Sequence, residues 1–197
     1  MTILDVAIGT ESIRTCLEQD FDVILLDQPC SPEDKAGRIH WSQPCQSFAT
    51  GSDGGQYLLL EDGTVGYFGC DGQAGRLADN LQEFFLLIVN FRQWQDFCAD
   101  QPGPQLIEEH PLTPAQEKLS ELLDVPLFSD RGILISRFKE TMQREPQFTA
   151  FYHEQDSVTV SPSLMNRAVD KKPVTLNNKS MTEQDRKELI DSYGLDR

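Results

Sequence analysis

The segment from residue 57 to residue 69 constrains the fold more than any other part of this chain. Two short apolar runs, residues 57–60 and 65–69, flank a polar segment that contains Asp62-Gly63. Asp-Gly is the dipeptide that type I′ hairpin turns favour, because both central residues of that turn need a positive φ. We therefore expect an antiparallel hairpin with Asp62 and Gly63 as its two-residue loop.

A two-residue loop fixes which residues of the hairpin face each other. The predicted cross-strand pairs are Leu60 with Val65, Leu58 with Tyr67 and Tyr57 with Phe68. Side chains alternate between the two faces of a strand, and here large apolar groups fall on both faces. We therefore expect the hairpin to belong to a larger sheet that is covered on both faces.

A capped aromatic helix is expected after the hairpin. Asn80 can accept the backbone N–H of Glu83 at the start of this helix, and the Glu83 side chain can reach back to the cap. The apolar residues then follow at helical spacing: Leu81, Phe84, Phe85, Ile88, Phe91, Trp94 and Phe97. Such a stripe is typical of a helix that faces the core. An exposed Phe85 or Trp94 would instead indicate an interface.

Three further amphipathic helices are predicted from the same kind of pattern. Thr10 can cap the first, Thr113 can cap the second, and the third begins near residues 129–130. Their expected inner faces are Ile13, Cys16, Leu17 and Phe21; Leu119, Leu122 and Leu123; and Leu134, Phe138, Thr141 and Met142.

Short strands are expected at residues 23–26, 41–50, 148–152 and 157–160. Pro44 interrupts the second of these, which favours an edge strand or an irregular lead-in over a central strand. Turns are expected at residues 52–55 and 71–75, where the glycines supply positive φ rather than hold a phosphate. No internal repeat is apparent.

Together these elements predict an α+β fold, in which a curved and mainly antiparallel sheet packs against helices and the C-terminal part is helical. Residues 1–165 would form a single domain with 26 acidic and 10 basic residues, a net charge of −16. Residues 166–197 have 6 acidic and 7 basic residues, a net charge of +1. This change predicts a linker-like tail, in which Thr182 can cap a short final helix.

The net charge of −15 narrows the classes of partner. An acidic surface repels nucleic acid phosphates and anionic membranes, and it speeds association with basic proteins. Acidity that serves only solubility is the alternative explanation. No apolar run approaches the roughly 20 residues of a spanning helix, and residues 1–5 do not resemble the start of a secretory signal. We expect a cytoplasmic protein that binds a basic protein, and neither nucleic acid nor a membrane.

Residues that could carry chemistry are scattered along the chain. The five cysteines are Cys16, Cys30, Cys45, Cys70 and Cys98. They form no Cys-x-x-Cys motif and no histidine completes a zinc pattern, so we expect reduced thiols, no metal and no cofactor. The conceivable catalytic sets are Cys70 with His110, the neighbouring Glu108 and Glu109, and the pair Glu61 and Asp62. None has a specific spacing, so we expect no enzymatic activity.

Residues 54–60, 62–65 and 72–78, together with the helix at residues 81–94, carry a family resemblance. They resemble the SUKH superfamily of bacterial immunity proteins and relatives of a fungal cell-wall synthesis regulator. The matched positions after the hairpin are Ala78, Leu81, Phe84, Phe85 and Leu86. The Leu-Pro pair, helix and Asn-Gly of the family's amino-terminal pattern are not evident before Gly51.

The resemblance implies an α+β fold and a cytoplasmic protein that binds and neutralises a toxin, often a nuclease. A nuclease has a cationic groove that binds phosphates. The carboxylates of an inhibitor could direct the inhibitor to this groove and occlude it. The candidate contact residues lie in turns around the sheet: Asp53, Glu61, Asp62, Asp71 and Asp79. For any single one of them, the role of a turn residue that faces water is the favoured alternative. A regulatory or scaffold module of the same fold without a toxin partner is the alternative, and a hydrolase is the third hypothesis.

Overall fold

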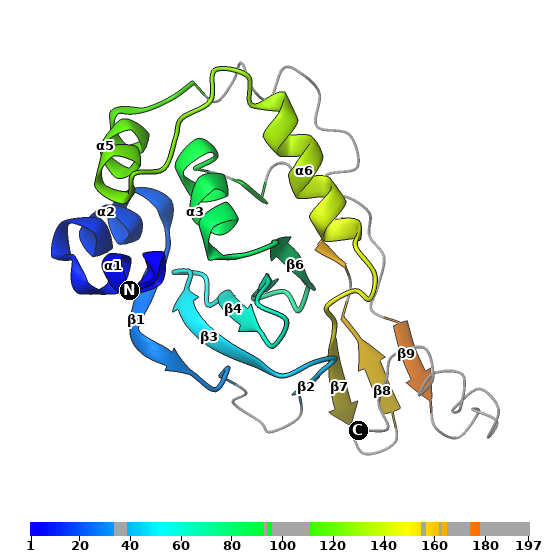
Figure 1. The fold of residues 1–197 in the computed structure, drawn as a ribbon. Helices are drawn as coiled ribbons and strands as arrows, with labels where there is room; N and C mark the ends of the chain where they lie inside the picture. Colours follow the sequence, from blue (N-terminus) through cyan, green and yellow to red (C-terminus); the bar gives the residue numbers. More distant parts are fainter. Residues whose placement is uncertain are drawn as a thin grey trace.

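The structure, a computed structural model, describes residues 1–33, 39–92, 94–95, 111–154, 157–161, 163–164 and 174–177. It has the predicted α+β fold, with antiparallel sheets packed against helices (Figure 1). The helices are α1 (Ile3–Gly9), α2 (Glu11–Phe21), α3 (Leu81–Asn90), α5 (Pro114–Leu123) and α6 (Gly132–Gln143). The strands are β1 (Ile24–Cys30), β2 (Ile39–Trp41), β3 (Cys45–Thr50), β4 (Gln56–Leu60), β5 (Val65–Phe68), β6 (Ala74–Ala78), β7 (Ala150–Glu154), β8 (Ser157–Val160) and β9 (Val174–Asn177).

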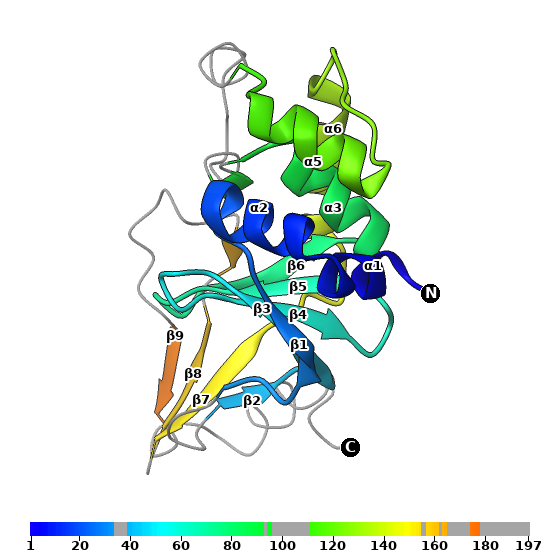
Figure 2. The same cartoon turned by 90° about the vertical axis from the view of Figure 1, so that its left-hand side faces the viewer.

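The strands form two sheets rather than the single sheet that the sequence predicted. One has five strands in the order β1-β3-β4-β5-β6, and the other has four in the order β2-β7-β8-β9. The pairings within both sheets are antiparallel. The helices lie on one side of the five-stranded sheet, and the four-stranded sheet lies beyond its other side (Figure 2). The predicted cover on both faces of the hairpin is therefore confirmed.

The predicted register of the β4–β5 hairpin is wrong by one residue. The observed pairs are Tyr57 with Tyr67, Leu58 with Gly66 and Leu59 with Val65. The Gly63 N–H donates to the Leu60 carbonyl at 2.9 Å, and the Leu60 N–H donates to the Thr64 carbonyl at 2.9 Å. Gly63 has a φ of +82°, whereas Asp62 does not have a positive φ. The loop is thus a three-residue turn closed by a left-handed glycine, rather than a type I′ turn.

This slip changes which side chains of the hairpin share a face, because neighbouring residues of a strand point in opposite directions. Tyr57, Val65 and Tyr67 belong to the core beneath the helices. Leu58 and Phe68 belong to a second core between the two sheets. In that second core the ring of Trp41 stacks on Phe148 at 5.8 Å and meets Phe68 edge-on at 5.0 Å.

The same turn occurs three times in the five-stranded sheet. Asp53-Gly54, Asp62-Gly63 and Asp71-Gly72 each precede a strand, and their glycines have φ values of +88°, +82° and +83°. The three dipeptides are spaced nine residues apart in the sequence. The sheet therefore contains a short internal repeat, in contrast to the expectation from the sequence.

The predicted helices that fall within the described residues are confirmed, although their ends differ. The inner faces of α2 and α6 hold the residues that the sequence predicted, and α5 begins with the predicted capping box of Thr113 and Gln116. Asn80 caps α3 by accepting the Glu83 N–H at 2.9 Å. An additional helix, α1, begins with a capping box that the sequence analysis did not identify, formed by Thr2 and Asp5.

Helix α3 ends at Asn90, earlier than its aromatic stripe suggested. The Asn90 side chain donates to the carbonyls of Leu86 and Pro126, and its oxygen accepts the Phe128 N–H. An asparagine that bonds to nearby backbone groups favours the end of a helix over its interior. Trp94 follows the helix and is still buried, whereas Phe97 lies outside the described residues.

The aromatic residues of this region are core residues. Phe84 and Phe85 are completely buried, and Trp94 is 1% exposed. The Trp94 ring packs edge-on against Tyr67 at 4.9 Å, and its indole N–H donates to the Tyr57 hydroxyl at 3.3 Å. The core interpretation is therefore confirmed, and Phe85 and Trp94 are not interface residues.

The segment predicted as one strand at residues 41–50 forms the end of β2 and the whole of β3, which belong to different sheets. Pro44 lies in an irregular lead-in to β3, which was one of the two predicted alternatives, and its missing N–H interrupts no ladder there. The prediction for the tail needs correction. Val174–Asn177 form strand β9, which pairs with β8, although this segment was expected to be linker-like. The helix predicted after Thr182 lies outside the described residues.

Candidate functional site

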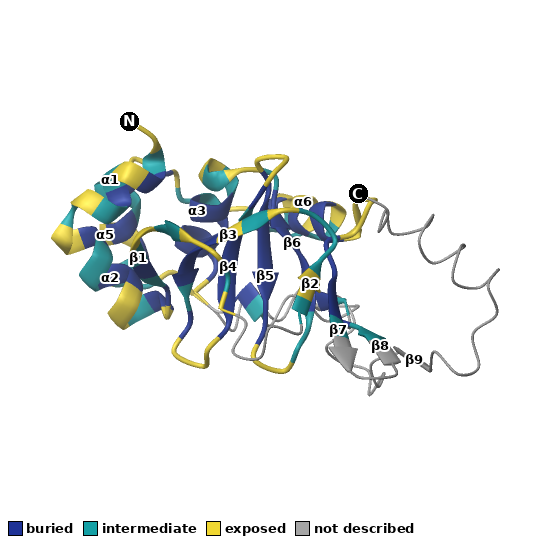
Figure 3. Cartoon of the chain, turned by 90° about the horizontal axis from the view of Figure 1, so that it is seen from below, coloured by how far each residue is buried: buried dark blue, intermediate teal, exposed yellow. Residues whose placement is uncertain are grey.

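The five predicted carboxylates lie at two opposite ends of the five-stranded sheet. The turns that hold Asp53 and Asp71 lie at the same end of the sheet. One turn follows β3 and the other follows β5, and these two strands run in the same direction. Glu61, Asp62 and Asp79 lie at the other end. The turns at the strand ends are exposed, whereas the strands between them are buried (Figure 3). The predicted set is thus divided into two groups at opposite ends of the sheet.

We call the end with Glu61, Asp62 and Asp79 the bridged end, because two of its carboxylates form internal ion pairs. The Asp62 carboxylate lies 2.7 Å from the guanidinium of Arg76, whose side chain is only 4% exposed. The same guanidinium donates to the Thr64 hydroxyl and, at 3.3 Å, to the Pro146 carbonyl. Asp62 is therefore the counter-ion of a buried cation.

The hydrogen bonds around Asp62 favour its ionised form. Burial alone would raise the pKa of this carboxyl, but hydrogen bonds from the hydroxyl and N–H of Thr64 and from Arg76 outweigh burial and lower the pKa. Asp79 accepts hydrogen bonds from Arg144 at 2.8 Å and from the Thr141 hydroxyl at 2.9 Å. Both carboxylates are thus occupied by internal donors, which leaves Glu61 as the acid of the predicted set at this end that no described donor holds.

We call the opposite end the acidic end, and define it by Asp22, Asp53 and Asp71. The Asp53 carboxylate accepts the Gly55 N–H at 2.8 Å, and the Cys70 thiol donates to it at 3.6 Å. These three aspartates form no ion pair within the described residues. The acidic end therefore presents carboxylates whose charge no described cation compensates.

Asp22 was not among the candidates from the sequence. It ends α2 with a left-handed conformation, at φ 55° and ψ 40°, and accepts the Ser52 N–H at 2.8 Å. Aspartate tolerates this conformation better than most residues, so its place after an amphipathic stripe was a usable signal for the helix end. The residues around Asp22 in the sequence did not indicate that it would contact a turn 30 residues away.

The acidic end is fixed to the aromatic core beneath it. A Cβ at Gly55 would lie 2.1 Å from the Tyr67 hydroxyl, so only glycine allows the turn to approach this ring. Burial raises the pKa of the Tyr57 phenol, and the negative charges of Asp22 and Asp53 raise it further. The core thus holds the turns in place and experiences their negative potential.

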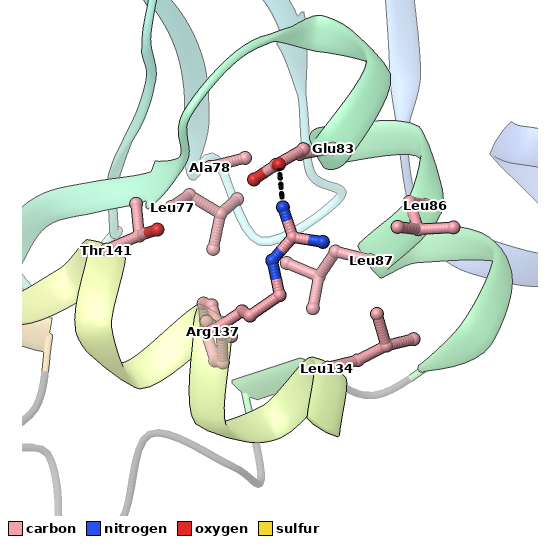
Figure 4. A pocket seen from close by; sticks show the side chains of 9 residues that line it. Leu77, Ala78, Glu83, Leu86, Leu87, Leu134, Arg137 and Thr141 are labelled. Atoms are coloured by element: carbon pink, nitrogen blue, oxygen red, sulfur yellow. Dashed lines mark hydrogen bonds and ion pairs between the residues drawn. The ribbon is translucent and has the colours of Figure 1, made fainter. Parts of the chain in front are cut away.

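A shallow pocket lies between α3 and α6, and it adjoins the bridged end, since its lining includes Thr141, which donates to Asp79. It is lined by apolar residues such as Leu77, Leu87 and Leu134, and Arg137 reaches across it to the Glu83 carboxylate (Figure 4). Its volume of about 30 Å³ is far below the roughly 300–1,000 Å³ of most small-molecule sites. The pocket has room for one or two water molecules rather than for a cofactor.

Two of the described thiols, those of Cys16 and Cys45, are poorly suited to nucleophilic chemistry, whereas Cys30 and Cys70 are exposed. Burial raises the pKa of the Cys45 thiol to about 12, and burial together with Asp20 raises the pKa of the Cys16 thiol. The candidate residues Glu108, Glu109 and His110 lie outside the described residues.

Two kinds of feature are absent from the part of the chain that the structure describes. Histidine, cysteine, aspartate and glutamate side chains form no group there that could hold a metal ion. No helix there is long and apolar enough to span a bilayer.

No family model, no curated protein and no solved structure matches this chain. The resemblance to the SUKH superfamily therefore stays a prediction from the sequence.

Proposed function

We propose that this protein is a non-catalytic binding protein that captures a basic partner protein at its acidic end. The observation that carries the proposal is the contrast between the two ends of the sheet. Asp62 and Asp79 are held by internal cations, whereas Asp22, Asp53 and Asp71 gather without one among the described residues. In a chain with a net charge of −15, such a surface attracts a cationic partner and orients it.

The fixed geometry of the acidic end supports the same proposal. Asp22 and Asp53 are oriented by backbone N–H groups, and the Asp53 turn sits directly on the Tyr67 ring. Side chains that are already ordered lose less conformational entropy when a partner binds. The acidic end is therefore suited to recognition as well as to long-range attraction.

The resemblance to the SUKH superfamily supplies the class of partner in this proposal. The partner would be a basic toxin such as a nuclease, and the protein would neutralise it in the cytoplasm by occluding its phosphate-binding groove. The carboxylates would then occupy the positions of substrate phosphates on the toxin.

A pull-down from the cytosol of the source organism tests the proposal with two matched variants. Asp71→Lys and Glu61→Lys change the net charge by the same amount, each in an exposed turn, but at opposite ends of the sheet. We expect a basic protein to be retained by the wild type and by Glu61→Lys at low salt, and to be lost with Asp71→Lys. Equal retention by all three baits would contradict the proposed surface.

The association rate of the captured protein provides the second measurement. The rate should fall as salt rises, because the Debye length shrinks from about 30 Å at 0.01 M to about 10 Å at 0.1 M ionic strength. Asp71→Lys should lower the rate at low salt more than Glu61→Lys does. A rate that is indifferent to salt and to both variants would exclude electrostatic capture.

A further inference from the structure

The three Asp-Gly turns share a backbone geometry. In each, the glycine N–H donates to the carbonyl of the residue three positions earlier: Gly54 to Gly51 at 3.0 Å, Gly63 to Leu60 at 2.9 Å and Gly72 to Gly69 at 2.9 Å. The φ values of the three glycines differ by only a few degrees. Differences in reactivity between these turns must therefore arise from the aspartate side chains.

The three carboxylates are held to different degrees. Asp62 accepts both the N–H and the hydroxyl of Thr64, at 3.1 and 2.6 Å, and pairs with Arg76. Asp53 accepts one N–H and one thiol. Asp71 is exposed, and its carboxylate has no hydrogen bond or ion pair within the described residues. The restraint thus decreases from Asp62 to Asp53 to Asp71.

An aspartate followed by glycine can rearrange without any enzyme or co-reactant. The glycine nitrogen attacks the side-chain Cγ, a C–N bond forms, the C–O bond to the hydroxyl breaks, and water leaves a five-membered cyclic imide. Water then adds to one of the two imide carbonyls, the bond from that carbonyl carbon to the imide nitrogen breaks, and the nitrogen regains its proton. Addition at Cγ restores aspartate, whereas addition at the backbone carbonyl gives isoaspartate, in which the main chain runs through Cβ and Cγ. Glycine favours the attack because no Cβ shields its nitrogen.

We propose that Asp71-Gly72 is a site of spontaneous isoaspartate formation, and that the contacts to Thr64 and Arg76 suppress the same reaction at Asp62-Gly63. The reactive carboxyl is the protonated one, since its hydroxyl is the leaving group, and its side chain must turn toward the next nitrogen. The donors around Asp62 oppose both requirements, because they stabilise the carboxylate and fix its orientation. Asp53, with two donors, is intermediate.

The modification would alter the acidic end. Isoaspartate at position 71 adds one backbone carbon to a three-residue loop and moves the carboxylate. Under the function proposed above, ageing would therefore weaken partner capture, while the rearrangement itself does not depend on that function.

Ageing of the full chain at physiological temperature and neutral pH tests the proposal, with a urea-unfolded sample as the reference. Digestion with an endoproteinase that cleaves before aspartate but not before isoaspartate leaves each modified site uncut, and mass spectrometry quantifies the uncut peptides. In the folded chain we expect severalfold more uncut product at position 71 than at position 62, with position 53 between them. In the unfolded chain the three sites should age at similar rates. Equal ageing of positions 62 and 71 in the folded chain would overturn the proposal.

Two variants separate the chemistry from general loosening of the fold. Thr64→Val removes a hydroxyl donor to Asp62, so isoaspartate at position 62 should rise while position 71 is unchanged. Asp71→Glu should abolish the product at position 71, because the longer side chain would have to close a six-membered ring. If Thr64→Val unfolded the protein, all three sites would rise together, and the site ratio in the wild type would still decide the question.

Discussion

The two ends of the five-stranded sheet are built from the same Asp-Gly turn but use their carboxylates differently. At the bridged end, Asp62 neutralises Arg76, and Asp79 neutralises Arg144. At the acidic end, Asp53 and Asp71 have no cation among the described residues. The dipeptide determines the shape of each turn. Whether its carboxylate is neutralised depends on whether a distant segment places a cationic side chain beside it. Arg76 comes from β6, and Arg144 comes from the end of α6.

The largest effect expected from this comparison is at Arg76. Arg76→Met should lower the free energy of unfolding by about 3 kcal/mol, the lower limit for breaking a buried ion pair, because Asp62 is 41% exposed and can regain water. Arg14→Met is the control, since it breaks the exposed pair with Asp27 and should cost no more than about 1 kcal/mol. Urea unfolding measures the free energy of unfolding of both variants. Equal losses would show that the pair of Arg76 and Asp62 stabilises the fold no more than an exposed ion pair does.

The turn glycines should behave alike at both ends. Gly63→Val and Gly54→Val should each cost about 1–2 kcal/mol or somewhat more, because L residues, and β-branched ones above all, resist positive φ. A Cβ at either position would meet no atom within 4 Å, so backbone strain is the only common cause. Melting temperatures measure the effect. An unchanged value for either variant would contradict the left-handed turn at that end.

The smallest expected effects come from replacing Asp62 or Asp71 by asparagine, which removes the negative charge of the side chain. At neutral pH, Asp62→Asn should cost about 1–2 kcal/mol, because the asparagine oxygen can still accept the Thr64 N–H but Arg76 loses its counter-ion, whereas Asp71→Asn should be close to neutral. The pKa of Asp62 is lowered in the folded protein, so its stabilising contribution is present above the ordinary aspartate value of 3.8 and is lost as the pH falls through the lower pKa of the folded protein. The difference between the wild type and Asp62→Asn should therefore shrink as the pH falls below 3.8. A constant difference in urea midpoint across this range would mean that ionisation of Asp62 does not stabilise the fold.

Local periodicity predicted most of the helices and their buried faces. Leu134, Phe138 and Met142 lie on one side of α6 because residues three and four apart share a helix face, and no distant information is needed to see this. The hairpin register failed because Asp62-Gly63 is compatible with a two-residue and a three-residue loop. A change of one loop residue was enough to exchange the faces of β5.

The candidate site was predictable only in part, because its electrostatics depend on long-range contacts. The turns with Asp53, Asp62 and Asp71 were visible as Asp-Gly dipeptides. The sequence carried no signal that Arg76 would be buried beside Asp62, or that Asp22 would meet the turn of Ser52. Charge counted along a chain therefore overestimates the charge that is available to a partner.

The arrangement of the two cores has a consequence for optical measurements. The chain has two tryptophans, and the structure places Trp94 in the core beneath the helices and Trp41 against Phe148 in the core between the sheets. Each layer thus carries its own fluorophore, and a Trp41→Phe or Trp94→Phe variant reports the emission of one layer alone. Coincident denaturation curves for the two variants would mean that helices and sheets melt as one cooperative unit. Separate curves would show that the layer between the sheets opens independently.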